Sequence, residues 1–180
     1  MQKLPYIIPE CFVDTNVVQT LIQRKGVNHQ MTCSQVISSM SKGKLADEFA
    51  VGIIDADKKE PPSIKDFNTI IGKSQEITLL KKSSKPHYLI KINNIMENFL
   101  LNCAKEIKFD MDEIGISPTL DGLKKITKNR TSQNNPIITK LVKELNKSSQ
   151  IKLLTSILCY LMENRYNAKE DDLKDFFNKL

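Results

Sequence analysis

The run of residues 50–57, Ala-Val-Gly-Ile-Ile-Asp-Ala-Asp, constrains the fold more than any other stretch of this chain. It is short and apolar, it contains β-branched residues and it ends in turn-forming residues, which indicates a strand buried on both faces. Such strands belong to parallel sheets that helices cover on both sides. Asp55 and Asp57 follow the apolar run, and residues two apart on an extended backbone point the same way. Because two like charges repel unless a cation or hydrogen-bond donors lie between them, this pair is the first candidate metal site.

The segments around this strand alternate between strand and helix patterns over the first hundred residues. We expect strands at 4–9, 27–31, 49–56, 76–80 and 87–92, and helices at 14–26, 32–43 and 63–71. Asp14 or Thr15 is a suitable cap for the first helix, and Gly26 a suitable stop. This alternation predicts an α/β fold that is Rossmann-like, with a mostly parallel sheet.

The periodicity becomes helical from Asn94 onward. Amphipathic helices are expected at 119–127, 137–145, 151–164 and 171–180, and residues 127–136 are the most loop-like piece. We therefore predict an α/β core at 1–108 and a C-terminal helical extension at 109–180 that packs on the core.

Composition narrows the class of protein. The longest apolar stretches, such as 157–162, are too short to span a bilayer, and the first ten residues lack the features of a secretory signal. We expect a cytoplasmic protein without a membrane partner. The four cysteines and two histidines do not show zinc-site spacing. Most of the cysteines are therefore interpreted as small core residues in a reducing compartment, and His29 and His87 as structural or surface residues.

The net charge of +6 bears on the partner. A basic surface around an acidic site is what a phosphodiester substrate requires, which makes nucleic acid the expected ligand. A Lys-rich solvated surface explains the same charge without a partner.

Further acids are expected at the same edge of the sheet as Asp55 and Asp57. Glu10 ends the first predicted strand, Asp14 begins the following helix, and Glu97 lies one turn into the helix after the strand at 87–92. Carboxylates at the ends of several strands suit Mg²⁺ or Mn²⁺, which prefer oxygen ligands. Two such ions can activate water and stabilise the leaving oxygen of a phosphodiester.

These residues resemble the Toprim domain of topoisomerases, primases and the overcoming-lysogenisation-defect nucleases. Glu10-Cys-Phe-Val-Asp14 is similar to the family's Glu-Gly-x-x-Asp, with Cys11 in place of the glycine, and Ile54-Asp55-Ala56-Asp57 is similar to its Asp-x-Asp strand end. Glu97, in Ile-Met-Glu-Asn-Phe-Leu, is similar to a further acid of the nuclease branch.

The resemblance implies a metal-dependent nuclease or phosphoryl-transfer module that hydrolyses phosphodiester bonds in DNA or RNA. Glu10 would be a metal ligand or general acid/base, Asp55 and Asp57 would be catalytic metal ligands, and Asp14 and Glu97 would bind a second metal. In the nuclease branch such a unit commonly works with an ABC-type ATPase, often in phage defence. This chain has no Walker-type phosphate loop, so the ATPase would be a separate polypeptide. Lys125 and Lys128 are candidates for neutralising transition-state charge.

Two other interpretations stay open. The same fold without catalysis could act as a binding or scaffold subunit. Alternatively, residues 12–18, Phe-Val-Asp-Thr-Asn-Val-Val, resemble the opening of a PIN-domain ribonuclease, in which Asp14 would be the primary ligand at a strand end.

Overall fold

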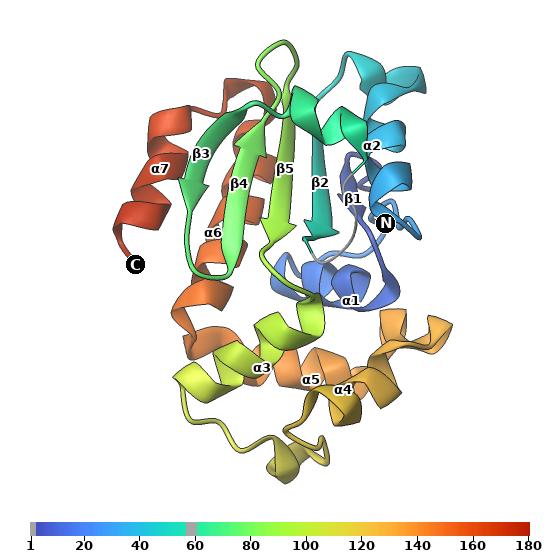
Figure 1. Ribbon diagram of the computed structural model, residues 1–180, viewed down its shortest axis with the longest axis vertical. Coiled ribbons are helices and arrows are strands. Elements are labelled where there is room, and N and C mark those ends of the chain that lie inside the picture. Colours follow the sequence, from blue (N-terminus) through green and yellow to red (C-terminus); the bar gives the residue numbers. More distant parts are fainter. Residues whose placement is uncertain (1–2, 57–60) are drawn as a thin grey trace.

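A five-stranded mixed sheet forms the centre of the fold in the computed structural model, which describes residues 3–56 and 61–180 (Figure 1). In their order across the sheet, the strands are β1 (Ile7–Pro9), β2 (Ala50–Asp55), β5 (His87–Ile92), β4 (Ile77–Lys81) and β3 (Thr69–Lys73). β1, β2 and β5 are parallel neighbours, whereas β4 pairs antiparallel with both β5 and β3. The predicted α/β class is confirmed, and the sheet is mixed, with parallel pairing confined to β1, β2 and β5.

Strand β2 is buried along its whole length, as its apolar run predicts. Val51 and Ile53 point into one hydrophobic cluster and Ala50 and Ile54 into another, as the two-residue period of a strand requires. Gly52 lies where a helix packs so closely that an added Cβ would come within 2.8 Å of the Met40 sulfur. Helices therefore cover both faces of the sheet at β2.

The described helices are α1 (Phe12–Leu21), α2 (Cys33–Ser41), α3 (Met96–Glu106), α4 (Leu120–Thr127), α5 (Pro136–Glu144), α6 (Ser149–Asn164) and α7 (Glu170–Asn178). Figure 1 shows α6 behind the sheet, α7 beside β3, and α1, α3, α4 and α5 grouped beyond the carboxyl ends of β2 and β5. No helix in the described ranges is long and apolar enough to cross a membrane.

The C-terminal helices share a hydrophobic core with the sheet. Leu141, Leu154 and Leu173 belong to the same buried cluster as Val51 and Ile90 of the central strands. The Lys81 ammonium group in β4 also forms an ion pair with Glu170 of α7, with a nitrogen–oxygen distance of 2.7 Å. The helices thus pack on the α/β part, and the boundary at residue 108 stays a prediction.

Two sequence-based expectations are wrong. Residues 27–31 do not form a strand, and Val27 makes only an isolated bridge to Leu4. The helix expected at 63–71 is a short 3₁₀ turn, η2 (Pro62–Asp66), followed by β3. Over so short a stretch, Ile70 and Ile71 fit the period of a helix and the period of a strand equally well. Their β-branched side chains favour the strand, which pairs with β4.

Candidate acidic site

Glu10 and Asp55 lie at the same edge of the sheet because β1 and β2 are parallel neighbours, with Pro9 beside Ile53. Both side chains are buried, Glu10 completely and Asp55 with 7% exposure. The main-chain N–H of Asp55 donates a hydrogen bond to Oε2 of Glu10 at 3.1 Å. The two predicted site residues at these strand ends are therefore in direct contact.

Asp14 joins this edge through the first turn of α1. The helix begins at Phe12, earlier than predicted, because Cys11 rather than Asp14 or Thr15 is its cap. The Cys11 N–H donates to Oδ2 of Asp14 at 3.1 Å, and the Asp14 N–H donates to the Cys11 sulfur at 3.5 Å. Asp14 is fully buried, and its Oδ1 has no hydrogen-bond partner within residues 3–56 and 61–180.

Glu97 approaches from α3, where it lies in the first turn with 9% exposure. Its Oε1 accepts a hydrogen bond from the Thr127 hydroxyl of α4 at 2.6 Å. Thr127 comes from the predicted C-terminal extension, so that part of the chain contributes to the site. Sequence reasoning missed Thr127, because a threonine thirty residues from its partner carries no recognisable signal.

The electrostatics show that these carboxylates are neighbours. Burial, together with the nearby charges of Glu10 and Glu97, raises the pKa of Asp14 to about 7, against the opposing effect of its hydrogen bonds with Cys11. Burial likewise raises the pKa of the Cys11 thiol, to which the charges of Asp14 and Asp55 add. The Cys11 thiol is therefore protonated at neutral pH and is a cap, not a nucleophile.

The predicted ligand set is brought together in part. Glu10 contacts Asp55, and the charges of Glu10 and Glu97 act on Asp14, whereas Asp57 lies outside the described residues. Among the described residues, no group of three or more acidic, histidine or cysteine side chains is arranged so that it could hold a metal ion. One oxygen each of Glu10, Asp14 and Glu97 accepts a hydrogen bond from the protein. A cation at this edge would therefore compete with those donors.

An aromatic pair borders the acidic site. The rings of Phe12 and His29 stack with centroids 4.3 Å apart, and Nδ1 of His29 is 2.9 Å from the Thr15 hydroxyl. Burial lowers the pKa of His29, so its ring is neutral at pH 7. His87 instead pairs its Nε2 with the Leu45 carbonyl at 2.9 Å, in agreement with a structural role.

Comparison with protein-family models found no match, and comparisons with curated proteins and with solved structures likewise found none.

Proposed function

We propose that this chain is a Toprim-like metal-dependent nuclease or phosphoryl-transfer module, and that Glu10, Asp14, Asp55 and Glu97 form its active site. The observation that carries the proposal is the buried Asp14 carboxylate, one oxygen of which lacks a hydrogen bond among the described residues while Glu10 and Glu97 lie near. A buried polar atom without a partner is costly, and several buried acids together are more so. Functional sites are where such costs are found.

The donor set suits Mg²⁺ or Mn²⁺. The four carboxyl groups form an oxygen donor set of the kind that hard cations select, and the neighbouring Cys11 thiol stays protonated, so it is not a competing ligand. Glu10, Asp14 and Asp55 would hold the ion, which would supply Lewis-acid activation of water and of the phosphate oxygen. The resemblance adds Asp57 as a further ligand.

The chain's own residues would position these acids. The Asp55 N–H holds one oxygen of Glu10, the Cys11 N–H holds one oxygen of Asp14, and Thr127 holds one oxygen of Glu97. Each bond fixes the orientation of one carboxylate group. Ligands held in this way are pre-organised for a reaction.

A scaffold subunit without catalysis is the second candidate. It is favoured by the capping box, in which Asp14 has a complete structural role at the start of α1. The PIN-like interpretation is weaker, because Asp14 lies within the first turn of a helix and not at a strand end. An ATPase partner would be a separate polypeptide, and it is compatible with both the nuclease candidate and the scaffold candidate.

Calorimetric titration with Mg²⁺ and Mn²⁺ tests the proposal directly. The wild type should bind the ion, and Asp14→Asn and Asp55→Asn should each weaken binding by at least about tenfold, since each removes one ligand charge. Glu163→Gln is the matched control, because Glu163 is an exposed glutamate on α6. Cleavage of labelled DNA and RNA with the metal, and its loss with a chelator, should follow the same ranking. If the wild type binds neither ion, the nuclease proposal fails and the scaffold function remains as the candidate.

A further inference from the structure

A large groove with a basic lining runs along α1, away from the acidic site. Its volume is about 1000 Å³, and it lies between α1 and the segment formed by η4 (Arg130–Asn134) and α5. Its lining contains four cationic side chains, six amides and two threonines, and no acidic residue. The cations are Arg24 and Lys25 on one wall and Lys140 and Lys143 on the other.

Asn16 holds the two walls of this groove together. It is only 2% exposed, and its amide group donates to the carbonyl oxygens of Ser132 at 2.8 Å and Asn135 at 3.1 Å. Its Oδ1 accepts from the hydroxyls of Thr20 and Thr139. The groove is therefore built by a satisfied buried amide, and its shape exists before any ligand arrives.

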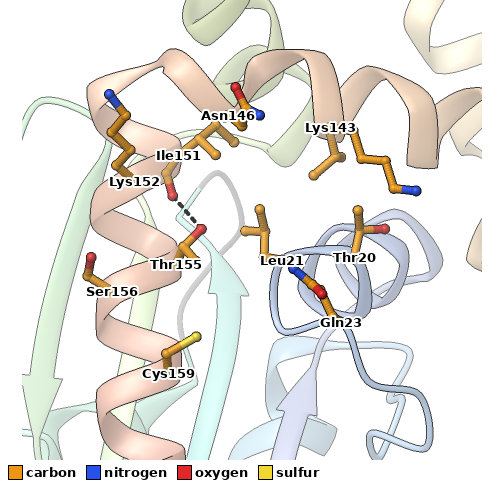
Figure 2. Close-up of a pocket in the computed structure, with 11 residues that line it drawn as sticks. Thr20, Leu21, Gln23, Lys143, Asn146, Ile151, Lys152, Thr155, Ser156 and Cys159 are labelled. Atoms are coloured by element: carbon orange, nitrogen blue, oxygen red, sulfur yellow. Dashed lines mark hydrogen bonds between the residues drawn. The ribbon is translucent and has the colours of Figure 1, made fainter.

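A second cavity of about 440 Å³ extends the groove toward α6 (Figure 2). The two share Thr20, Gln23, Lys143 and Asn146, and the second adds the cation Lys152. In Figure 2 the Lys143 side chain reaches from α5 toward Thr20 on α1. The lining of the second cavity also contains no acidic residue, although Leu21, Val142 and Ile151 make it more apolar than the larger groove. The combined lining therefore carries cations and no carboxylate.

We propose that this groove binds the phosphodiester backbone of a nucleic-acid strand. Lysine, arginine, amide and hydroxyl groups are the side chains that contact phosphate and sugar oxygens. Pro136 is the one apolar residue among those that line the larger groove, so the groove offers no aromatic or large aliphatic side chain of the kind that anchors a protein partner. It also has no aromatic lining residue on which a base could stack. Binding is therefore independent of sequence and depends strongly on salt.

This inference rests on the proposed function for the identity of its ligand and adds the surface that holds the substrate. Helix α1 carries Asp14 in its first turn, and Asn16 and Thr20 of the groove lining lie further along it, with Gln23 just beyond its end. Residues two apart on a helix do not share a face, so Asp14 and Asn16 point to different sides of α1. The groove and the acidic site therefore share one helix, and the groove would hold the strand beside that site.

The test is binding of a fluorescent oligothymidylate of about 20 nucleotides, longer than the roughly 4–16 nucleotides that one single-strand-binding fold covers. It is measured by anisotropy in a chelator, so that no cleavage occurs, over a range of salt concentrations. Lys140→Gln/Lys143→Gln should weaken binding and reduce the slope of log affinity against log salt by about 1.4. Arg24→Gln/Lys25→Gln should do the same from the opposite wall. Lys42→Gln/Lys44→Gln is the control, since both lysines are exposed, lie near the end of α2 and do not line the groove.

The outcomes separate this inference from the proposed function. Weaker binding in both groove pairs with an unchanged control supports the groove, even if calorimetric titration shows that the wild type binds no metal. Equal weakening in all three pairs would mean a response to net charge alone and would overturn the inference. Wild-type protein that fails to bind the oligonucleotide at low salt would overturn it as well, whatever the acidic site binds.

Discussion

The main-chain N–H of Asp55 donates a hydrogen bond to the Glu10 carboxylate at 3.1 Å, which joins the carboxyl ends of β1 and β2 through a candidate site residue. Glu10 therefore has two separable roles: its oxygen accepts a hydrogen bond that supports the fold, and its negative charge serves the proposed reaction. A substitution that keeps the hydrogen-bond acceptor and removes the charge distinguishes the two roles.

Glu10→Gln should fold normally and lose activity. Its amide oxygen can still accept from the Asp55 N–H, whereas the negative charge is gone. Metal-dependent cleavage should fall by roughly 100-fold, the size typical of removing one group that stabilises a transition state. Glu10→Ala should in addition lower the free energy of unfolding by about 1–3 kcal/mol, because it leaves a buried N–H without its acceptor. Cleavage by Glu10→Gln at the wild-type rate would show that Glu10 is structural.

Metal-free protein should lose stability as the pH rises from about 4 to about 7. The folded-state pKa of Asp14 is about 7, against 3.8 for an ordinary carboxyl group, so the folded protein holds a proton in this range that the unfolded chain has released. The free energy of unfolding therefore decreases across this window and levels off above it. Urea unfolding in a chelator measures it, and Asp14→Asn should flatten the profile. An unchanged slope in Asp14→Asn would assign the titration to another group.

Thr127→Val should weaken the fold through Glu97. The substitution removes the hydroxyl that donates to Glu97 at 2.6 Å and leaves a buried carboxylate without that donor. We expect a loss of about 1–3 kcal/mol in the free energy of unfolding. Thr127→Ser is the matched control, because it keeps the hydroxyl and should retain most of the stability. A Thr127→Val variant as stable as the wild type would show that this hydrogen bond does not support the fold.

Gly52→Ala should destabilise the face of the sheet that α2 covers. The new methyl group would meet Met40 at 2.8 Å and both Val36 and Leu89 at 2.9 Å, distances at which something must shift. Overpacking of this kind costs about 1–3 kcal/mol, measured by chemical unfolding. In a Met40→Ala background the same substitution should cost less, since the nearest obstacle is gone. An equal cost in both backgrounds would place the strain in the strand itself.

The sequence carried strong signals for the central strand and for the helices after Asn94. Residues 50–54 have an uninterrupted apolar pattern, and the helical periods around 96–106, 149–164 and 170–178 are long enough to be distinctive. The secondary structure predicted for 27–31 and 63–71 is wrong. Both segments are short, and their apolar residues fit the period of a helix as well as that of a strand. Their structure depends on what packs against them.

Some residues of the candidate site could likewise be predicted from the sequence, and others could not. Glu10, Asp14, Asp55 and Glu97 could be found, because strand ends and first helical turns place acids at a common edge. Thr127 and Asn16 could not, since their partners are distant in the sequence and their roles exist only after the helices have packed. The start of α1 was also misplaced, because a cysteine is an unusual helix cap and the pattern favoured aspartate or threonine.

Helix α7 has a consequence for how copies of this chain behave toward one another. It lies beside β3, the outer strand of the sheet, with its Phe177 ring against Gly72, and the Lys81–Glu170 ion pair holds its first turn (Figure 1). An open strand edge is a template on which another chain can add a strand and start aggregation. Protection from such edge-to-edge association therefore depends on nine residues near the end of the chain, and truncation before Glu170 would expose β3 to self-association.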